Sequence, residues 1–468
     1  MSNSSEMNLP SRQNKKTALP MEPEDAASVT DKVLTAPDQI LHKRYNFTTL
    51  FAMFLSVSAG WECIISNLFQ NLVTGGPTAL VWGFLFSAAA AQAMAFSLAE
   101  LASSGSNPLG NVGMQIQSMA IIAYPTTYEP ERWHVFAILL FTMIIALCIN
   151  IFRPRMLHYL SVIAMTFHFL GFFAITIVLL STTKEKNSAK MVFAQPLNNS
   201  AAFMSIDNPA RFTEETQNPR MDVPRAMVWG VAGGTVLTFP FILVIAFCMG
   251  DPTALLDSPI ARINPLAQIL LNSTGSMAAV MALCSMIVII AFVVAIDQTG
   301  AISRLIMAQA RDGAIPFAKT FARISPRWNT PIPALLLSAA IQVVLSTVYI
   351  ANEIAYFGIS SGTITLQALS YCIPVALHIW ARKRHGMEYG PWNMGRYGRL
   401  VNIFSVLSYA FLFVIMCIPQ QYPVTTLNMN YASVITGGVV ILAIILFYTW
   451  GRKHYFGHII DVLDATRE

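Results

Sequence analysis

Long runs of apolar residues, separated by short polar segments, dominate the chain from residue 46 onward. An α-helix needs a run of about 20 apolar residues to cross the hydrocarbon core of a bilayer. About ten such runs are predicted to span the membrane: Phe47–Phe69, Thr78–Leu101, Val135–Ile151, Leu160–Leu180, Met227–Met249, Met277–Ile302, Pro333–Ile350, Ile364–Trp380, Val401–Ile418 and Tyr431–Trp450. The predicted fold class is therefore an all-α, polytopic membrane protein.

The first run is interrupted in its middle by Ser58, Ala59, Gly60, Trp61 and Glu62. A carboxylate inside a membrane span is costly unless it faces protein, water or a ligand. Glycine and small neighbours allow a helix to unwind, and a cavity or a bound solute can then satisfy the freed backbone groups. We therefore predict that Glu62 is a site residue, at a point where the helix unwinds beside a cavity or a bound solute. The alternative is an ordinary first helix whose glutamate pairs with a neighbouring helix.

Two regions lack a convincing span. Leu109–Tyr124 is only weakly apolar, and its length of about 16 residues is short of the roughly 20 that a crossing needs. It is a marginal span. Between Ser181 and Arg225 no apolar run is long enough to cross, because proline and amide side chains break the best candidate, Met191–Ile206.

The positions of Lys and Arg test this count, because these residues concentrate in cytoplasmic loops. Basic clusters occur at His42-Lys43-Arg44, at Arg153 and Arg155, between Arg304 and Arg327, at Arg382-Lys383-Arg384 with Arg396 and Arg399, and at Arg452-Lys453. The predicted spans cannot bring all of these clusters to one side of the membrane, whether or not the marginal segment crosses. One crossing is missing from the apolar pattern.

Composition agrees with a membrane protein and excludes several other classes. The 468 residues are 55% hydrophobic and 11% charged, against about 25% charged in soluble domains. The net charge of +5 comes from basic residues at the ends of apolar segments, which indicates membrane orientation and not a nucleic-acid partner. The six cysteines show no CxxC pair or metal-ligand spacing. No Walker A, Gly-x-Ser-x-Gly or His-Glu-x-x-His sequence occurs, so we expect neither an enzyme nor a cofactor.

A series of short motifs in a fixed order runs along most of the chain. They are Trp61-Glu62, Gly75-Gly76-Pro77, Ser97 to Ser103 (SLAELAS), Tyr128 to His134 (YEPERWH), Thr213-Glu214-Glu215, Asn218-Pro219-Arg220, Val223 to Ala226 (VPRA), Gly250-Asp251, Ser303-Arg304, Ala310 to Gly313 (ARDG), Gly390 to Gly395 (GPWNMG), Met429-Asn430-Tyr431 and Gly451-Arg452-Lys453. In this order they resemble the fungal amino acid, GABA and choline permeases of the amino acid–polyamine–organocation (APC) superfamily.

This resemblance implies a twelve-helix secondary transporter with two inverted five-helix repeats, in which the first and sixth helices unwind at mid-membrane and hold the substrate. Ser58, Ala59, Gly60, Trp61 and Glu62 match the unwound part of the first helix, and Glu62 is then the candidate partner of a substrate cation. The implied partners are a small amine-bearing solute, a coupling proton and the lipid bilayer. The implied location is the plasma membrane or the vacuolar membrane.

The chain departs from the family pattern in two places. The start of the third helix is absent after Pro108, and the sixth helix is absent between about Phe203 and Phe212. The expected fold is thus an APC-type inverted-repeat helix bundle with the third helix truncated and the sixth missing. Residues 1–45 form a predicted disordered cytoplasmic tail, residues 46–455 the transmembrane permease domain and residues 456–468 a short cytoplasmic tail. An alternative function is a non-transporting truncated isoform, acting as a solute sensor or as a partner of a full-length permease.

Three further titratable residues lie in or beside the predicted spans. Asp297 lies inside the span Met277–Ile302, where an acid suggests a proton or cation pathway, although an interfacial or helix-pairing role is an equal alternative. His158 and His168 are interpreted as packing or interfacial residues.

Overall fold

The computed structural model describes residues 45–58, 60–101, 131–194, 216–258, 260–261, 264–385, 392–418, 424–425 and 429–455. The predicted tails at residues 1–45 and 456–468 lie almost entirely outside these ranges. Ala59, the whole marginal segment Leu109–Tyr124 and the region assigned to the absent sixth helix also lie outside these ranges.

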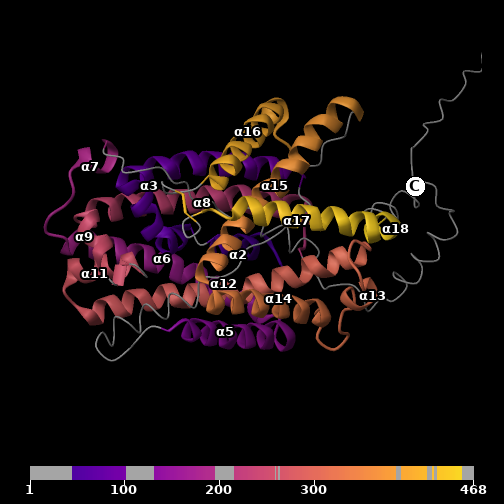
Figure 1. The fold of residues 1–468 in the computed structure, drawn as a ribbon, viewed down its shortest axis with the longest axis horizontal. Helices are drawn as coiled ribbons and strands as arrows, with labels where there is room; N and C mark the ends of the chain where they lie inside the picture. Colours follow the sequence, from indigo (N-terminus) through magenta and orange to yellow (C-terminus); the bar gives the residue numbers. More distant parts are fainter. Residues whose placement is uncertain are drawn as a thin grey trace, which may run out of the picture. The chain divides into compact units, whose positions relative to one another are not determined.

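Every element named in the described residues is a helix (Figure 1). The elements are α2 Phe47–Ser58, α3 Gly60–Leu101, α5 Arg132–Phe152, α6 Met156–Thr182, α7 Ala189–Ala194, α8 Pro219–Cys248, α9 Pro252–Asp257, α11 Pro265–Thr274, α12 Met277–Arg311, α13 Ala318–Phe321, α14 Ile332–Ala351, α15 Glu353–His385, the 3-10 helix η3 Gly395–Tyr397, α16 Gly398–Cys417, α17 Ala432–Leu446, the π-helix η4 Phe447–Gly451 and α18 Arg452–His454.

Within the described residues, 9 helices are long and apolar enough to cross a membrane. They correspond to every predicted span except the first, so the predicted all-α, polytopic membrane fold is confirmed. α12 is longer than predicted, because it continues beyond Ile302 to Arg311. A helix of its 35 residues is about 52 Å long and therefore extends past the hydrocarbon core at one or both ends.

The first two predicted spans lie in α2 and α3. α2 ends at Ser58 and α3 begins at Gly60, on either side of Ala59, which lies outside the described residues. Inside α3, Gly76 has φ 61° and ψ −166°, a conformation that glycine adopts without the steric cost of a side chain. α3 therefore contains two helical segments that meet at Gly76.

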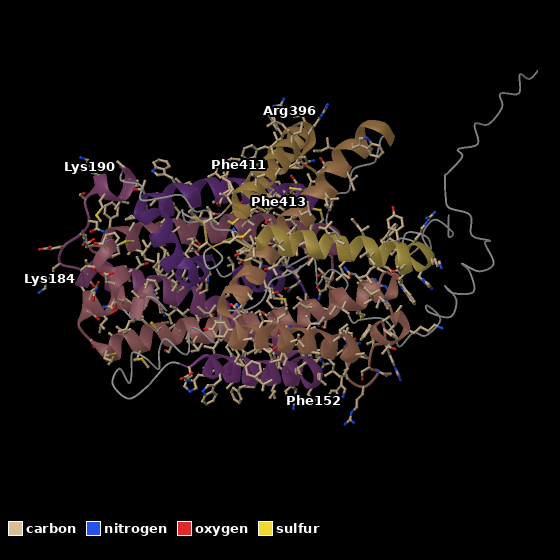
Figure 2. The ribbon with its side chains drawn as sticks, viewed as in Figure 1. Phe152, Lys184, Lys190, Arg396, Phe411 and Phe413 are labelled. Atoms are coloured by element: carbon tan, nitrogen blue, oxygen red, sulfur yellow. The ribbon has the colours of Figure 1, made fainter. Side chains whose placement is uncertain are left out.

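α7, α9 and α11 gather at one end of the bundle (Figure 1). We call this the α7 end, and Lys184 and Lys190 also lie there (Figure 2). The Trp82 indole, near the start of the second segment of α3, donates a hydrogen bond to the Phe193 carbonyl in α7 at 3.1 Å. Asn187 donates from Nδ2 to the Ala246 carbonyl at 2.9 Å. The chain after α6 is thereby attached to the last turn of α8.

The starts of α2, α6 and α8 meet at the opposite end of the bundle. The Gln217 backbone N–H, just before α8, donates to the Tyr45 carbonyl, just before α2, at 2.8 Å. Thr49 Oγ1 in α2 lies 2.7 Å from His158 Nδ1 in the first turn of α6. Because α8 begins here and finishes at the α7 end, its two termini mark the two sides of the membrane.

These contacts locate the crossing that is missing from the apolar pattern. Ala194 ends α7 at one end of the bundle, whereas Thr216 lies beside Tyr45 at the other. Residues 195–215, outside the described part, join the two ends, and their sequence contains no apolar run of spanning length. The chain thus changes sides where the sequence offers no membrane helix.

α8 is the helix around which the first spans pack, since it lies against both α2 and α3. A Cβ added to Gly230 of α8 would lie 2.2 Å from Cδ1 of Phe54, so the missing side chain is what allows α2 to approach this closely. One buried apolar cluster surrounds Phe54, and a second surrounds Trp61 and Phe241. The second cluster contains the candidate site.

Candidate functional site

A buried acid–histidine pair is the central feature of the candidate site. Oε1 of Glu62, in the first turn of α3, lies 2.6 Å from Nδ1 of His168 in the middle of α6. The two residues are 5% and 0% exposed, so neither group has access to bulk water. A short hydrogen bond of this kind is typical of a charge-assisted pair. Here α6 provides the partner that a carboxylate inside a membrane requires.

Aromatic rings enclose this pair. The Trp61 ring lies 5.8 Å from the His168 ring and 4.9 Å from the Phe241 ring, measured between centroids. A Cβ added to Gly171, one turn beyond His168, would lie 3.2 Å from the Trp61 indole, so this ring rests directly on the backbone of α6. α3, α6 and α8 therefore meet at Trp61, which is completely buried.

Two polar atoms at the site make no hydrogen bond within the described residues. They are Trp61 Nε1 and His168 Nε2, both buried. An indole N–H can only donate, whereas Nε2 of a neutral histidine that donates from Nδ1 is an acceptor. A buried polar group without a partner costs about 1–3 kcal/mol. The site therefore has unused hydrogen-bonding capacity of the kind that a polar ligand satisfies.

The local geometry of the predicted site residues follows from the start of α3. Gly60 and Trp61 are buried in its first turn, beside Glu62. An acid in this position is favoured by the partial positive charge at a helix N-terminus. Ser58 ends α2, while Ala59 lies outside the described residues. The structure thus shows the contact with a neighbouring helix that the sequence analysis gave as the alternative role of Glu62. The substrate-binding role of the five residues stays a prediction.

His168 is the site residue that sequence reasoning misses. Its interpretation as a packing or interfacial residue overlooks its hydrogen bond to Glu62. The available signal is its position inside a long apolar span, because a buried acid elsewhere in the chain needs a polar partner. The sequence alone does not show which helix supplies that partner.

Comparison with known proteins places the chain among transporters. The amino acid permease family matches residues 105–441. A protein of Macrophomina phaseolina, named as an amino acid/polyamine transporter, is 29% identical and aligns with 81% of this chain and 95% of its own length. Amino-acid permease 2 of Neurospora crassa is 29% identical, with 91% and 88% of the two chains covered. The choline transporter of Saccharomyces cerevisiae is 24% identical, with 91% and 84% covered.

Solved structures are more distant. A manganese transporter of Eremococcus coleocola aligns with 92% of this chain and 96% of its own at 12% identity, with a TM-score of 0.41, which is too low to inform the site. The family match covers well over half of the sequence and includes seven of the nine membrane helices in the described residues, with part of an eighth. The chain is an integral membrane protein that belongs to the amino acid permease family of the APC superfamily, a family of transporters and not of enzymes.

Proposed function

We propose that this permease binds a small solute with a positively charged amine, such as an amino acid, GABA or choline, and carries it by proton-coupled secondary transport. The buried carboxylate of Glu62 carries this proposal. A carboxylate bordered by aromatic rings is suited to an ammonium group, because charge attraction and cation–π contacts act together. Relatives named as an amino-acid permease and a choline transporter support this class of solute.

In the proposed mechanism the amine competes with His168 for Glu62. His168 Nδ1 lies 2.6 Å from Oε1, which is where a substrate ammonium group would bind. The backbone at Ser58, Ala59 and Gly60 contributes groups next to the start of α3, where a helix N-terminus favours a substrate carboxylate. Rocking of one group of helices against another then exposes the site to each side in turn. We place this activity in the plasma membrane or the vacuolar membrane.

Uptake of labelled solutes tests the binding role of Glu62. The chain is expressed in cells that lack their own amine permeases, and uptake of labelled amino acids, GABA and choline is measured. Glu62→Gln keeps the shape of the side chain and removes its charge, so we expect substrate affinity to fall at least about tenfold, the 1.4 kcal/mol that a charged contact supplies. Asp257→Asn, which neutralises an exposed acid at the end of α9, is the matched control and leaves affinity unchanged.

The two variants separate binding from folding. Both proteins are compared with the unaltered chain for amount at the membrane and for thermal stability before uptake is scored. Uptake at full affinity by Glu62→Gln would remove Glu62 from the substrate site and leave the pair with His168 as a helix-pairing contact.

A non-transporting role is the second candidate. Alignment with the Neurospora permease extends over 485 residues, more than the 468 of this chain, although it includes only 91% of the chain. This excess shows that the alignment contains gaps, and it supports the proposal that family segments are absent from this chain. We place the absent segments near residue 108 and at residues 203–212, where the motif order breaks. A chain that acts as a sensor or partner gives no uptake alone, but it changes uptake by a complete permease in the same cell. Co-expression with such a permease tests this, and the absence of any effect contradicts it.

A further inference from the structure

A second buried acid lies in α12, away from the pair of Glu62 and His168. Asp297 is completely buried at a point where α12 packs against α6. Its Oδ2 lies 2.9 Å from Oγ of Ser161 in α6, on the side toward the start of α6. A buried acid inside a membrane helix is costly and needs an explanation of its own.

The hydrogen bonds of Ser161 indicate the protonation state of Asp297. Ser161 Oγ lies 2.7 Å from the Leu157 carbonyl and 2.9 Å from Asp297 Oδ2. A hydroxyl has one proton to donate, and a carbonyl oxygen only accepts. If Asp297 is ionised, the single hydroxyl proton has to be shared between the two acceptors. If Asp297 is protonated, it donates to Ser161, Ser161 donates to Leu157, and both contacts are hydrogen bonds.

The other carboxyl oxygen supports the same state. Oδ1 of Asp297 is buried and has no hydrogen-bond partner among the described residues. An unpaired buried oxygen costs more when it carries charge than when it belongs to a neutral carbonyl. Burial in a medium of low dielectric constant also favours the uncharged form of a carboxyl group.

Arg304 is placed to balance the charge when Asp297 loses its proton. It is 4% exposed, lies seven residues further along α12, and its Nη1 donates to the Gly300 carbonyl at 2.8 Å. The side chain therefore reaches back along the helix toward Asp297. Asn150 of α5 lies next to Gly300 and leaves no room there for a larger residue.

Other titratable groups on the helices around α12 are engaged elsewhere or exposed. His158 contacts Thr49, and His168 contacts Glu62. On the remaining neighbours, Cys148 of α5 is exposed, Lys319 of α13 is exposed, and Tyr349 of α14 packs against Tyr356.

We propose that Asp297 is a proton-binding residue of this permease. In the conformation described here it is a neutral carboxylic acid that donates to Ser161. When α6 and α12 move apart, the O–H bond breaks, the proton passes to water, and the carboxylate that remains is balanced by Arg304. The protonation state stands on the contacts of Asp297 alone, whereas its use in coupling rests on the proposed transport function.

Infrared spectroscopy of the purified chain in lipid tests the protonation state. A protonated carboxylic acid has a carbonyl-stretch band that a carboxylate lacks. We expect such a band at neutral pH, its loss in Asp297→Asn and its retention in Glu62→Gln. Asparagine can still donate to Ser161, so this variant should fold, which a thermal melt checks. Ser161→Ala provides a second measurement, because loss of the hydrogen bond shifts the band while the acid remains. Spectra that neither substitution changes would overturn the proposal.

Transport in vesicles tests the coupling. In Asp297→Asn we expect accumulation driven by a pH gradient to fall at least tenfold, while exchange of labelled for unlabelled solute at equal pH stays within twofold. A sodium gradient at equal pH should drive no accumulation in either protein. Accumulation that still follows the pH gradient in Asp297→Asn would rule out a coupling role. If the unaltered chain moves no solute in any assay, the transport proposal fails, and the infrared band still decides the protonation state.

Discussion

At the scale of single residues, the pair of Glu62 and His168 predicts a strong energetic coupling. Removing one partner of a buried hydrogen-bonded pair leaves the other group unsatisfied, which costs about 1–3 kcal/mol and more when that group is charged. We expect His168→Ala and Glu62→Gln each to lower stability, and the double substitution to cost less than the sum of the two. Thermal or denaturant unfolding in detergent gives the double-mutant cycle. A coupling energy near zero would mean that the contact at 2.6 Å contributes nothing.

The same pair shows what single residues reveal before a structure is known. Glu62 is recognisable in the sequence because a carboxylate in an apolar run is costly wherever it lies. His168 is not, because its role depends on which face of α6 meets α3, and that is set by packing between distant segments. Asp297 falls between these cases, since its position inside an apolar span is visible in the sequence, whereas its burial and its contact with Ser161 are not.

At the scale of helices, the approach of α2 to α8 predicts an unusually costly substitution. A Cβ at Gly230 would lie 2.2 to 2.7 Å from atoms of the Phe54 ring, which is 1% exposed and has no free space to move into. We expect Gly230→Ala to destabilise the protein by about 1–3 kcal/mol through overpacking. Gly233→Ala, on the same helix, meets nothing closer than 3.7 Å and is the matched control. Equal melting temperatures for the two variants would contradict this packing.

The contact between α15 and α17 gives a parallel prediction. A Cβ at Gly362 in α15 would lie 2.7 Å from Cγ2 of Ile435 in α17, whereas one at Gly438 would meet nothing within 4 Å. We expect Gly362→Ala to lower the melting temperature. Adding Ile435→Ala to this variant should restore part of the loss, because it removes the clashing Cγ2 atom. Gly438→Ala should be neutral or slightly stabilising, because alanine is the better helix former. Melting curves of the four proteins check this.

The helices themselves are predictable because each carries its own signal. A run of apolar residues must be helical in a bilayer, since only a helix satisfies its backbone without partners from other segments. The break inside α3 also has a local cause, because Gly76 and Pro77 both depart readily from helix geometry. The arrangement of the helices has no comparable local signal, and the central position of α8 against α2 and α3 follows from packing over the whole chain.

At the scale of the whole molecule, the termini of α7 and α8 predict that the chain changes sides of the membrane between residues 194 and 216. Single cysteines introduced at Lys184 and Gln217, both exposed, should react from opposite sides with a thiol reagent that cannot cross a membrane. The experiment uses a background in which the native cysteines are replaced by serine. Ser276→Cys, exposed at the start of α12, should react from the same side as Lys184→Cys, because α11 and α7 lie at the same end of the bundle.

The result decides how this chain relates to a complete permease. Labelling of positions 184 and 217 from opposite sides means that the connection between them crosses the membrane, although its sequence contains no apolar run of spanning length. Polar groups at that depth must then be satisfied by protein or by a water-filled cavity. Labelling from one side instead means that α8 enters the membrane in the opposite orientation to the one described. The basic residues of α12 and its following loop would then face outward, against the charge rule that the other clusters follow.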